Sequence, residues 1–252
     1  MYFSLCISTM DRFDNYLRWY LPRFLTIKYI NEIIVSDEDG RDAEKIKNAF
    51  PNSIIKTVIH EGENGPFLNK LNACKHAKNE WIILMDSDNC ANEIYFKSAY
   101  EYIQTNDLGK ATILAPDNAD PHYDFRHFDN MVYKRGLLKV FEEHEKQEMG
   151  ERAPLRVLMN TGNYILNKYL IDNLNIENER DKLCMSSACD VTYMNILFME
   201  QMDAEFHVVP KMEYEHSVHA NSTYLNTYEK YPEFIQSINK RFEDLETKNL
   251  EI

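Results

Sequence analysis

Five apolar residues run without a break into two carboxylates in the segment Trp81-Ile82-Ile83-Leu84-Met85-Asp86-Ser87-Asp88. An apolar run of this length is typical of a strand buried on both faces of a parallel sheet. In open parallel sheets, ligands bind beyond the carboxyl ends of such strands. In extended backbone, the side chains of Asp86 and Asp88 point the same way and their positions lie about 7 Å apart. Both carboxylates can therefore bind one hard cation, directly or through water. The segment therefore predicts an α/β sheet with an acidic site at its edge, unless these acids only cap the next helix.

Strand-like runs and helical patterns alternate over the first 115 residues. The strands are predicted at residues 2–8, 32–36, 53–59, 81–85 and 111–115. The helices between them are predicted at residues 11–27 with a bend at Pro22, from residue 39 to just before Pro51, and at 67–78 and 92–104. This alternation predicts an α/β fold whose central sheet is Rossmann-like and mostly parallel, with right-handed crossovers and helices on both faces.

The alternation lapses from residue 116 to about residue 160, in a polar, aromatic and charged region with a helical stretch at 135–148. Helical patterns return at 164–174 and 189–202, a strand is predicted at 205–209, and a last helix at 228–246. We expect a single domain over residues 1–252. Its parts would be a nucleotide-binding half (about 1–115), an acceptor-side half (about 116–225) and a C-terminal helix (about 226–252).

The charge of the chain limits its ligands. With 41 acidic against 28 basic residues, the formal net charge is −13, which argues against nucleic acid as a partner because phosphate backbones need a basic face. A nucleoside diphosphate bound by so acidic a protein needs local neutralisation by a divalent cation and a few Lys or Arg residues. With five scattered cysteines and neither a signal peptide nor a transmembrane segment visible, we expect a cytoplasmic protein.

Polar residues follow three of the predicted strands: Ser8-Thr9-Met10 the first, Ser36-Asp37-Glu38-Asp39 the second, and Asp86-Ser87-Asp88-Asn89 the fourth. The carboxyl ends of these strands lie on one edge of a doubly wound sheet, so one pocket can use all three segments. Asp37 is placed to accept hydrogen bonds from a base or ribose; the alternative is that it caps the next helix.

Further motifs occur in a fixed order around that edge. A glycine-containing loop and helix, Gly65-Pro66-Phe67-Leu68-Asn69-Lys70-Leu71-Asn72, precedes the strand that ends in Asp86. Later segments are Asn160-Thr161-Gly162-Asn163-Tyr164-Ile165, Ser187-Ala188-Cys189-Asp190-Val191 and Tyr214-Glu215-His216-Ser217-Val218-His219. This ordered set resembles the GT-A glycosyltransferases, especially the family-2-like members, from about Phe3 to His219.

The resemblance implies a metal-dependent transfer of sugar from a nucleoside-diphosphate sugar, with a UDP-sugar favoured, to a glycan or other hydroxyl acceptor, with inversion. It implies Asp190 as the catalytic base and a divalent cation, Mn²⁺ favoured or Mg²⁺, held by Asp86, Asp88 and His216, with His219 as the alternative histidine. Donor contacts are implied for the following residues: Thr9, Asp37, Lys70, Asn72, Asp86 and Ser87. The sequence departs from the family pattern at two positions, because Lys70 stands where arginine is commoner and Cys189 replaces the first acid of a Glu-Asp pair.

Other functions are compatible with parts of this pattern. A sugar-phosphate nucleotidyltransferase shares the alternating sheet, but it needs a glycine-rich, basic loop after the first strand, and Ser8-Thr9-Met10-Asp11 contains no glycine. A phosphatase with an aspartyl nucleophile places its acids after the first strand rather than the fourth. The non-enzymatic alternative is a nucleotide- or carbohydrate-binding module without catalytic activity. Asp190 itself has a second interpretation, as the N-terminal cap of a helix.

Overall fold

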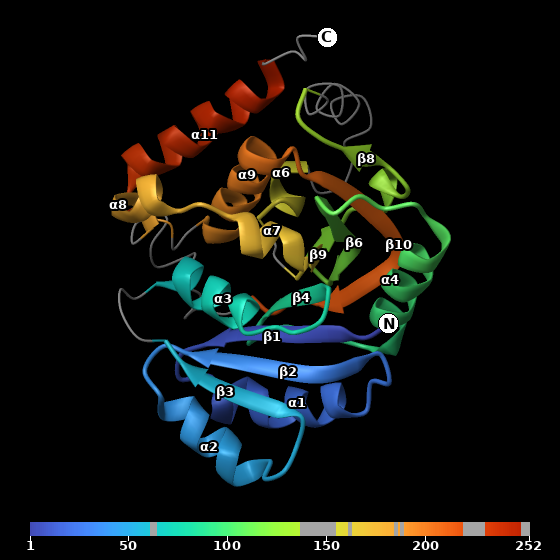
Figure 1. Cartoon of the computed structure of the whole chain (residues 1–252), viewed down its shortest axis with the longest axis vertical. Helices are drawn as coiled ribbons and strands as arrows, with labels where there is room; N and C mark the ends of the chain where they lie inside the picture. Colours follow the sequence, from blue (N-terminus) through green and yellow to red (C-terminus); the bar gives the residue numbers. More distant parts are fainter. Residues whose placement is uncertain are drawn as a thin grey trace.

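The computed structural model describes residues 1–60, 65–136, 155–160, 163–183, 186, 189–218 and 230–247 (Figure 1). Within these ranges the chain forms a mixed α/β domain around one curled sheet in the order β3-β2-β1-β4-β9-β6-β10-β5. Most of the helical stretch predicted at 135–148 lies outside the described residues. The same holds for Thr161, Gly162, Ser187, Ala188 and His219.

The first half of the sheet is parallel, as predicted. Its strands are β3 (Ile55–Ile59), β2 (Ile30–Asp37), β1 (Phe3–Thr9) and β4 (Trp81–Asp86), side by side in that order. All five apolar residues of β4 are buried, because helices cover the sheet on both faces.

The helices between these strands also agree with the sequence patterns. The first begins as a π-helical turn, η1 (Phe13–Leu17), and continues as α1 (Arg18–Leu25), which contains Pro22. The next two are α2 (Arg41–Ala49) and α3 (Pro66–Lys75). The chain reverses its direction along the sheet after β3, so right-handed crossovers place α1 and α2 on one face and α3 on the other. Figure 1 shows α2 and α3 on opposite sides of these strands.

The second half of the sheet contains a correction to the predicted helix at 164–174. Its first residues form the strand β9 (Ile165–Asn167), and only α7 (Lys168–Asn173) is helical. The strand β9 lies antiparallel between β4 and β6 (Thr112–Asp120), which joins the two halves of the sheet. The buried side chains of Ile165 and Leu166 fit a helix or a strand equally well in so short a run, and pairing with distant strands decides the outcome.

The last long strand, β10 (Glu205–Glu215), extends well beyond the predicted residues 205–209 and runs parallel to β6. Its register shifts between Val209 and Glu213, around Lys211, which has φ +65°. Short strands complete the sheet: β5 (Cys90–Ala91) and β8 (Val132–Tyr133) pair with β10, and β7 (Tyr123–Asp124) pairs with β6 and leads into η2 (Arg126–Phe128). The helix α4 (Glu93–Thr105), capped by Asn92, covers β10.

Helices of the C-terminal half lie on one side of this sheet (Figure 1). They are α6 (Leu155–Leu158), η3 (Glu177–Glu179), α8 (Arg180–Leu183), α9 (Asp190–Met202) and α11 (Pro232–Thr247). Ten consecutive residues of α9 are buried, so this helix is surrounded by protein. An edge-to-face ring contact between Phe234 and Tyr193 and an ion pair between Arg241 and Glu200 hold α11 against it. Among the helices of the described residues, none has both the length and the apolar character needed to cross a membrane.

Candidate active site

The carboxyl ends of three parallel strands meet at one edge of the sheet, as the sequence predicted. Ser8 lies opposite Asp86 in the β1–β4 pairing, and Thr9 lies opposite Asp37 in the β1–β2 pairing. A cleft with a volume of about 610 Å³ opens at this edge. Residues from β1, α3, β4, α9, α6 and α11 line it, so the two halves of the chain share one cavity.

A lysine and two carboxylates form the charged centre of the cleft. The Nζ atom of Lys70, on α3, lies 2.9 Å from an oxygen of Asp86 and donates a 2.7 Å hydrogen bond to Asp190, at the first turn of α9. The side chains of Lys70 and Asp190 are only 8% and 11% exposed. Ion pairs so deeply buried are strong only when each charge has a close partner, which this arrangement provides.

Burial and charge act in opposite directions on these groups. Burial alone would lower the pKa of Lys70, but the carboxylates of Asp190 and Asp86 outweigh it and raise that pKa, so Lys70 is a cation. Burial raises the pKa of Asp190 above its usual value, while Lys70 opposes the rise. Asp190 is thus paired with a cation and is more basic than an exposed aspartate.

Asparagine side chains fix the loop that carries Asp86 and Asp88. The backbone N–H of Asp86 donates to Oδ1 of Asn163 at 3.0 Å, and the hydroxyl of buried Tyr95 donates to the carbonyl of Asn163 at 2.6 Å. Asn89 accepts the backbone N–H of Ser217 at 2.9 Å. The loop after β4 is thereby attached to the segment that follows β10, and both line the cleft.

His216 lies beside this loop, inside a group of aromatic rings. Its ring centre is 5.3 Å from that of Tyr123 and 5.8 Å from that of His122, and its Nδ1 is 3.1 Å from the hydroxyl of Tyr214. Burial lowers the pKa of His216, although Asp86 and Asp88 oppose this, so the ring is neutral at pH 7, the form that binds metals.

The expected metal ligands are not preassembled. Within the described ranges, no three His, Cys, Asp or Glu side chains lie together in a way that could hold a metal ion. Asp86, Asp88 and His216 all line the cleft, but Asp86 is paired with Lys70.

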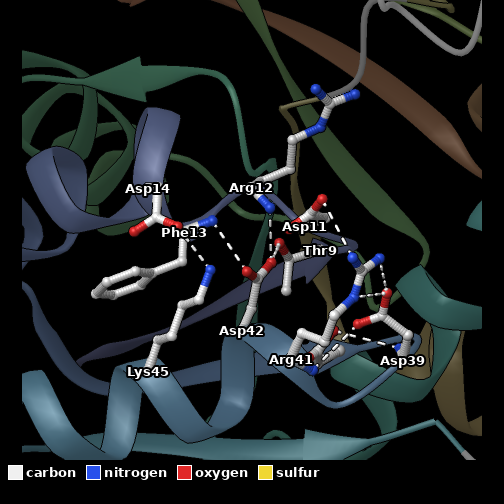
Figure 2. Close-up of polar contacts among 10 residues, drawn as sticks. Thr9, Asp11, Arg12, Phe13, Asp14, Asp39, Arg41, Asp42 and Lys45 are labelled. Carbon is white, nitrogen blue, oxygen red and sulfur yellow. Dashed lines mark hydrogen bonds and ion pairs between the residues drawn. The ribbon is translucent and has the colours of Figure 1, made fainter.

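A buried aspartate, Asp42, shapes the loop after β1 (Figure 2). Asp42, on α2, accepts the hydroxyl of Thr9 at 2.6 Å and the backbone N–H groups of Arg12 and Phe13 at 2.8 and 3.0 Å. Figure 2 shows the side chain of Arg12 directed away from Asp42, and Arg12 lines the cleft. Asp42 therefore fixes the backbone from which Thr9 and Arg12 face the cavity.

Two of the expected donor contacts do not line the cleft. Asp37 is fully buried, and its carboxylate accepts the backbone N–H of Ala43 at 2.8 Å, so it acts as the helix cap that was the alternative interpretation. Asn72 donates to the hydroxyl of Ser36 at 2.8 Å. Both side chains are thus hydrogen-bonded within the protein, away from the cavity. The other expected residues, which are Thr9, Lys70, Asp86, Ser87, Asp88, Asp190 and His216, all line the cavity.

Several residues of the site escaped the sequence analysis. Asn69 lines the cleft, donates to the carbonyl of Thr9 at 3.0 Å, and has a buried Oδ1 with no hydrogen-bond partner among the described residues. Glu38 also lines it, and burial raises the pKa of its carboxyl. The signal for Asn69 was present in its position next to Lys70 in the loop-helix motif. Asn163 likewise stands in one of the motifs, but Asp42 gives no such signal, because its role depends on contacts with a distant part of the chain.

Comparison with known families agrees with this geometry. The family model of glycosyl transferase family 2 matches residues 4–160, which is more than half of the chain and includes the strand edge and Lys70. The chain belongs to glycosyl transferase family 2. No curated protein matches the sequence of this chain significantly.

Several solved structures share its fold. The crystal structure of S. aureus TarS 1-349 matches with a TM-score of 0.63 and 14% identity, over 96% of this chain and 65% of that one. Its complex with UDP-GlcNAc matches with a TM-score of 0.62 and 16% identity, over 96% and 66%. A mycobacterial protein matches with a TM-score of 0.57 and 13% identity, over 94% and 74%. The fold of this family-2 chain is thus of the GT-A type, and it spans about two thirds of the TarS fragment.

Proposed function

We propose that this protein transfers a sugar from a nucleoside-diphosphate sugar, with a UDP-sugar favoured, to a hydroxyl of a glycan or another acceptor. One observation carries the proposal: Asp190, Lys70 and Asp86 form a single ion-paired group in a cleft of about 610 Å³ at the carboxyl edge of the sheet. This edge is where doubly wound folds hold nucleotides. Membership of family 2, and the UDP-GlcNAc bound by the structurally similar TarS, support this donor class.

Asp190 is the general base in this proposal. Its carboxylate takes the proton of the acceptor hydroxyl as that oxygen attacks the anomeric carbon of the donor, and the bond from that carbon to the diphosphate breaks on the opposite side. A single displacement of this kind inverts the anomeric configuration. Because burial raises the pKa of Asp190, its carboxylate accepts a proton more readily than an exposed aspartate does.

In this proposal Lys70 has a second part besides the diphosphate contact that the sequence resemblance implied. It positions Asp190 and keeps it ionised, because its ammonium group is paired with both carboxylates. An ammonium has three N–H donors, and Lys70 lines the cleft, so it also adds positive charge where the leaving diphosphate accumulates negative charge.

A divalent cation, Mn²⁺ or Mg²⁺, fits this site as a partner of the diphosphate. Such ions are commonly held by only one or two carboxylates together with phosphate oxygens, so three protein ligands are not needed. Asp88 and Asp86 would hold it, with neutral His216 as a further ligand. The ion would stabilise the charge of the departing nucleoside diphosphate.

A donor screen tests this function. The protein is incubated with UDP-, GDP-, CDP- and dTDP-sugars, with Mn²⁺ or Mg²⁺, and release of the free nucleoside diphosphate is measured. We expect metal-dependent release from one nucleotide class, and only background release from a double variant Asp86→Asn, Asp88→Asn that keeps the wild-type circular dichroism spectrum. Release by the double variant at the wild-type rate would contradict the assignment.

A further inference from the structure

The cleft has two chemically different ends, joined by the charged group. At one end, the strand edge presents polar and charged side chains, among them Thr9, Arg12 and Glu38. At the other end, α6, α9 and α11 present mainly apolar side chains, which are Val157, Val191, Ile235, Ile238 and Phe242. Asp190 connects the two ends, because it is bonded to Lys70 on one side and precedes Val191 on the other.

The apolar end is held in place by specific contacts. Phe242 is only 2% exposed, and the guanidinium carbon of Arg156 lies 4.6 Å above its ring. Arg241, the neighbour of Phe242, is paired with Glu200 on α9 and with Glu179. The helix α11 is therefore fixed against α9, so its apolar side forms a permanent wall of the cavity.

Polar groups at this end are few. The hydroxyl of Thr192, two positions after Asp190, donates to Oδ1 of Asn160 at 2.8 Å. Both residues line the cleft. Asn239, on α11, and Arg156, on α6, add a third and a fourth polar side chain, and the guanidinium of Arg156 lies over the ring of Phe242. Few polar groups on an apolar wall are typical of a site that orients one part of a ligand and buries another.

We infer that the acceptor carries an apolar group next to the hydroxyl that is glycosylated, and that this group lies against Val157, Ile235 and Ile238. The inference rests on the proposed function, since the polar end takes the nucleotide and leaves this end for the acceptor. A purely polar oligosaccharide would leave the wall unused. An alkyl or aryl group buries it, and the same contact removes water from beside Asp190, where water would compete with the acceptor hydroxyl.

A titration with matched glycosides tests this inference. The probes are methyl β-D-glucoside and n-octyl β-D-glucoside, the latter kept below its critical micelle concentration, each added in the presence of UDP. Binding is followed by the NMR signals of ¹³C-labelled isoleucine δ1 methyl groups. We expect octyl glucoside to shift the signals of Ile235 and Ile238. Ile59 and Ile94, which are 54% and 56% exposed and lie outside the cleft, report non-specific contact with the alkyl chain.

Affinity gives the second readout. Each buried methylene contributes a factor of about four, so octyl glucoside should bind at least about 10-fold more tightly than methyl glucoside. The variant Ile235→Ser should weaken octyl glucoside several-fold and leave the affinity for UDP unchanged. The matched control is Gln236→Ser, at the next, exposed position of α11, and it should change neither affinity.

The outcomes separate this inference from the proposed function. Equal affinity for the two glycosides, or methyl shifts as large at Ile59 and Ile94 as at Ile235, contradicts the apolar acceptor site even when a nucleotide sugar is cleaved. Absence of nucleotide-sugar cleavage contradicts the proposed function, whatever the glycosides do.

Discussion

Lys70 is the residue on which the charged centre of the cleft depends. The carboxylates of Asp86 and Asp190 lie 2.9 and 2.7 Å from its Nζ atom. Without the lysine, these two carboxylates would repel each other. The sequence resemblance named these three residues and implied a diphosphate contact for the lysine, but it did not predict the ion pairs. The ion pair between Lys70 and Asp190 depends on the folded structure, because the two residues are 120 positions apart in the sequence.

Replacing Lys70 therefore affects stability as well as activity. Lys70→Met leaves two neighbouring carboxylates without their cation, and breaking a buried pair in this way costs about 3 kcal/mol or more. We expect a lower free energy of unfolding in urea titrations, and loss of sugar transfer. Lys75→Met, at the exposed end of the same helix, is the control and should change neither quantity. A variant at position 70 as stable as the control would contradict the buried ion pair.

At the scale of elements, local patterns were sufficient where each strand or helix has a long pattern of its own. The alternation of β1, β2, β3 and β4 with α1, α2 and α3 was predicted from residue patterns alone. The strand β9 was wrongly predicted as helix, because its apolar run is too short to distinguish the two and pairing with β4 and β6, about 50 to 85 positions away, decides the outcome. Asp37 was correctly placed at a strand end, but its carboxylate accepts the backbone N–H of Ala43 in the first turn of α2.

The loop between β1 and η1 is stabilised by Asp42 of α2, which gives a second prediction. Asp42→Ala removes the acceptor of two backbone N–H groups and one hydroxyl, and unsatisfied buried donors cost about 2 kcal/mol or more in total. Donor affinity should fall as well, since Thr9 and Arg12 lose their fixed backbone. Asp14→Ala is the control in the same region, because its ion pair with Lys45 is exposed to solvent and contributes little to stability. Equal unfolding midpoints for the two variants would contradict this role of Asp42.

The bulge of β10 is held by an acid with an unusual pKa. Asp117, on β6, accepts the backbone N–H of Lys211 at 2.6 Å, and its other oxygen is buried without a hydrogen-bond partner among the described residues. Burial, together with the nearby carboxylates of Asp129 and Glu213, raises the pKa of Asp117 to about 7, although the hydrogen bond from Lys211 opposes the rise.

The raised pKa of Asp117 makes stability depend on pH. The folded state holds its proton more tightly than the unfolded chain, whose pKa is near 3.8, so this contribution is complete below that value and is lost as the pH rises through about 7. Asp117→Asn mimics the protonated form. We expect its free energy of unfolding to exceed that of the wild type at about pH 8, whereas exposed Asp107→Asn should follow the wild-type curve. Parallel curves for wild type and Asp117→Asn between about pH 5 and 8 would exclude this titration.

At the scale of the whole molecule, the cleft exists only because two halves of the chain meet along one sheet. The first half supplies the polar strand edge and Lys70, and the second half supplies Asp190 and the apolar wall of α11. Sequence motifs located the edge and the acids because their spacing is local. They gave no indication of the wall, because Val157, Ile235 and Phe242 read as ordinary core residues until their positions around the cavity are known.

The role of Asp190 is the central claim about this assembled cleft, and the variant Asp190→Asn tests it most directly. With the donor found in the nucleotide-sugar screen, the turnover number for transfer is measured next to the calorimetric affinity for that donor's nucleoside diphosphate. A general base contributes a factor of about 10² to 10⁴, so we expect kcat to fall by that factor while the affinity stays within about twofold of wild type. Transfer at close to the wild-type rate by a folded Asp190→Asn protein would contradict the account, because Asp190 would then be only the first residue of a helix.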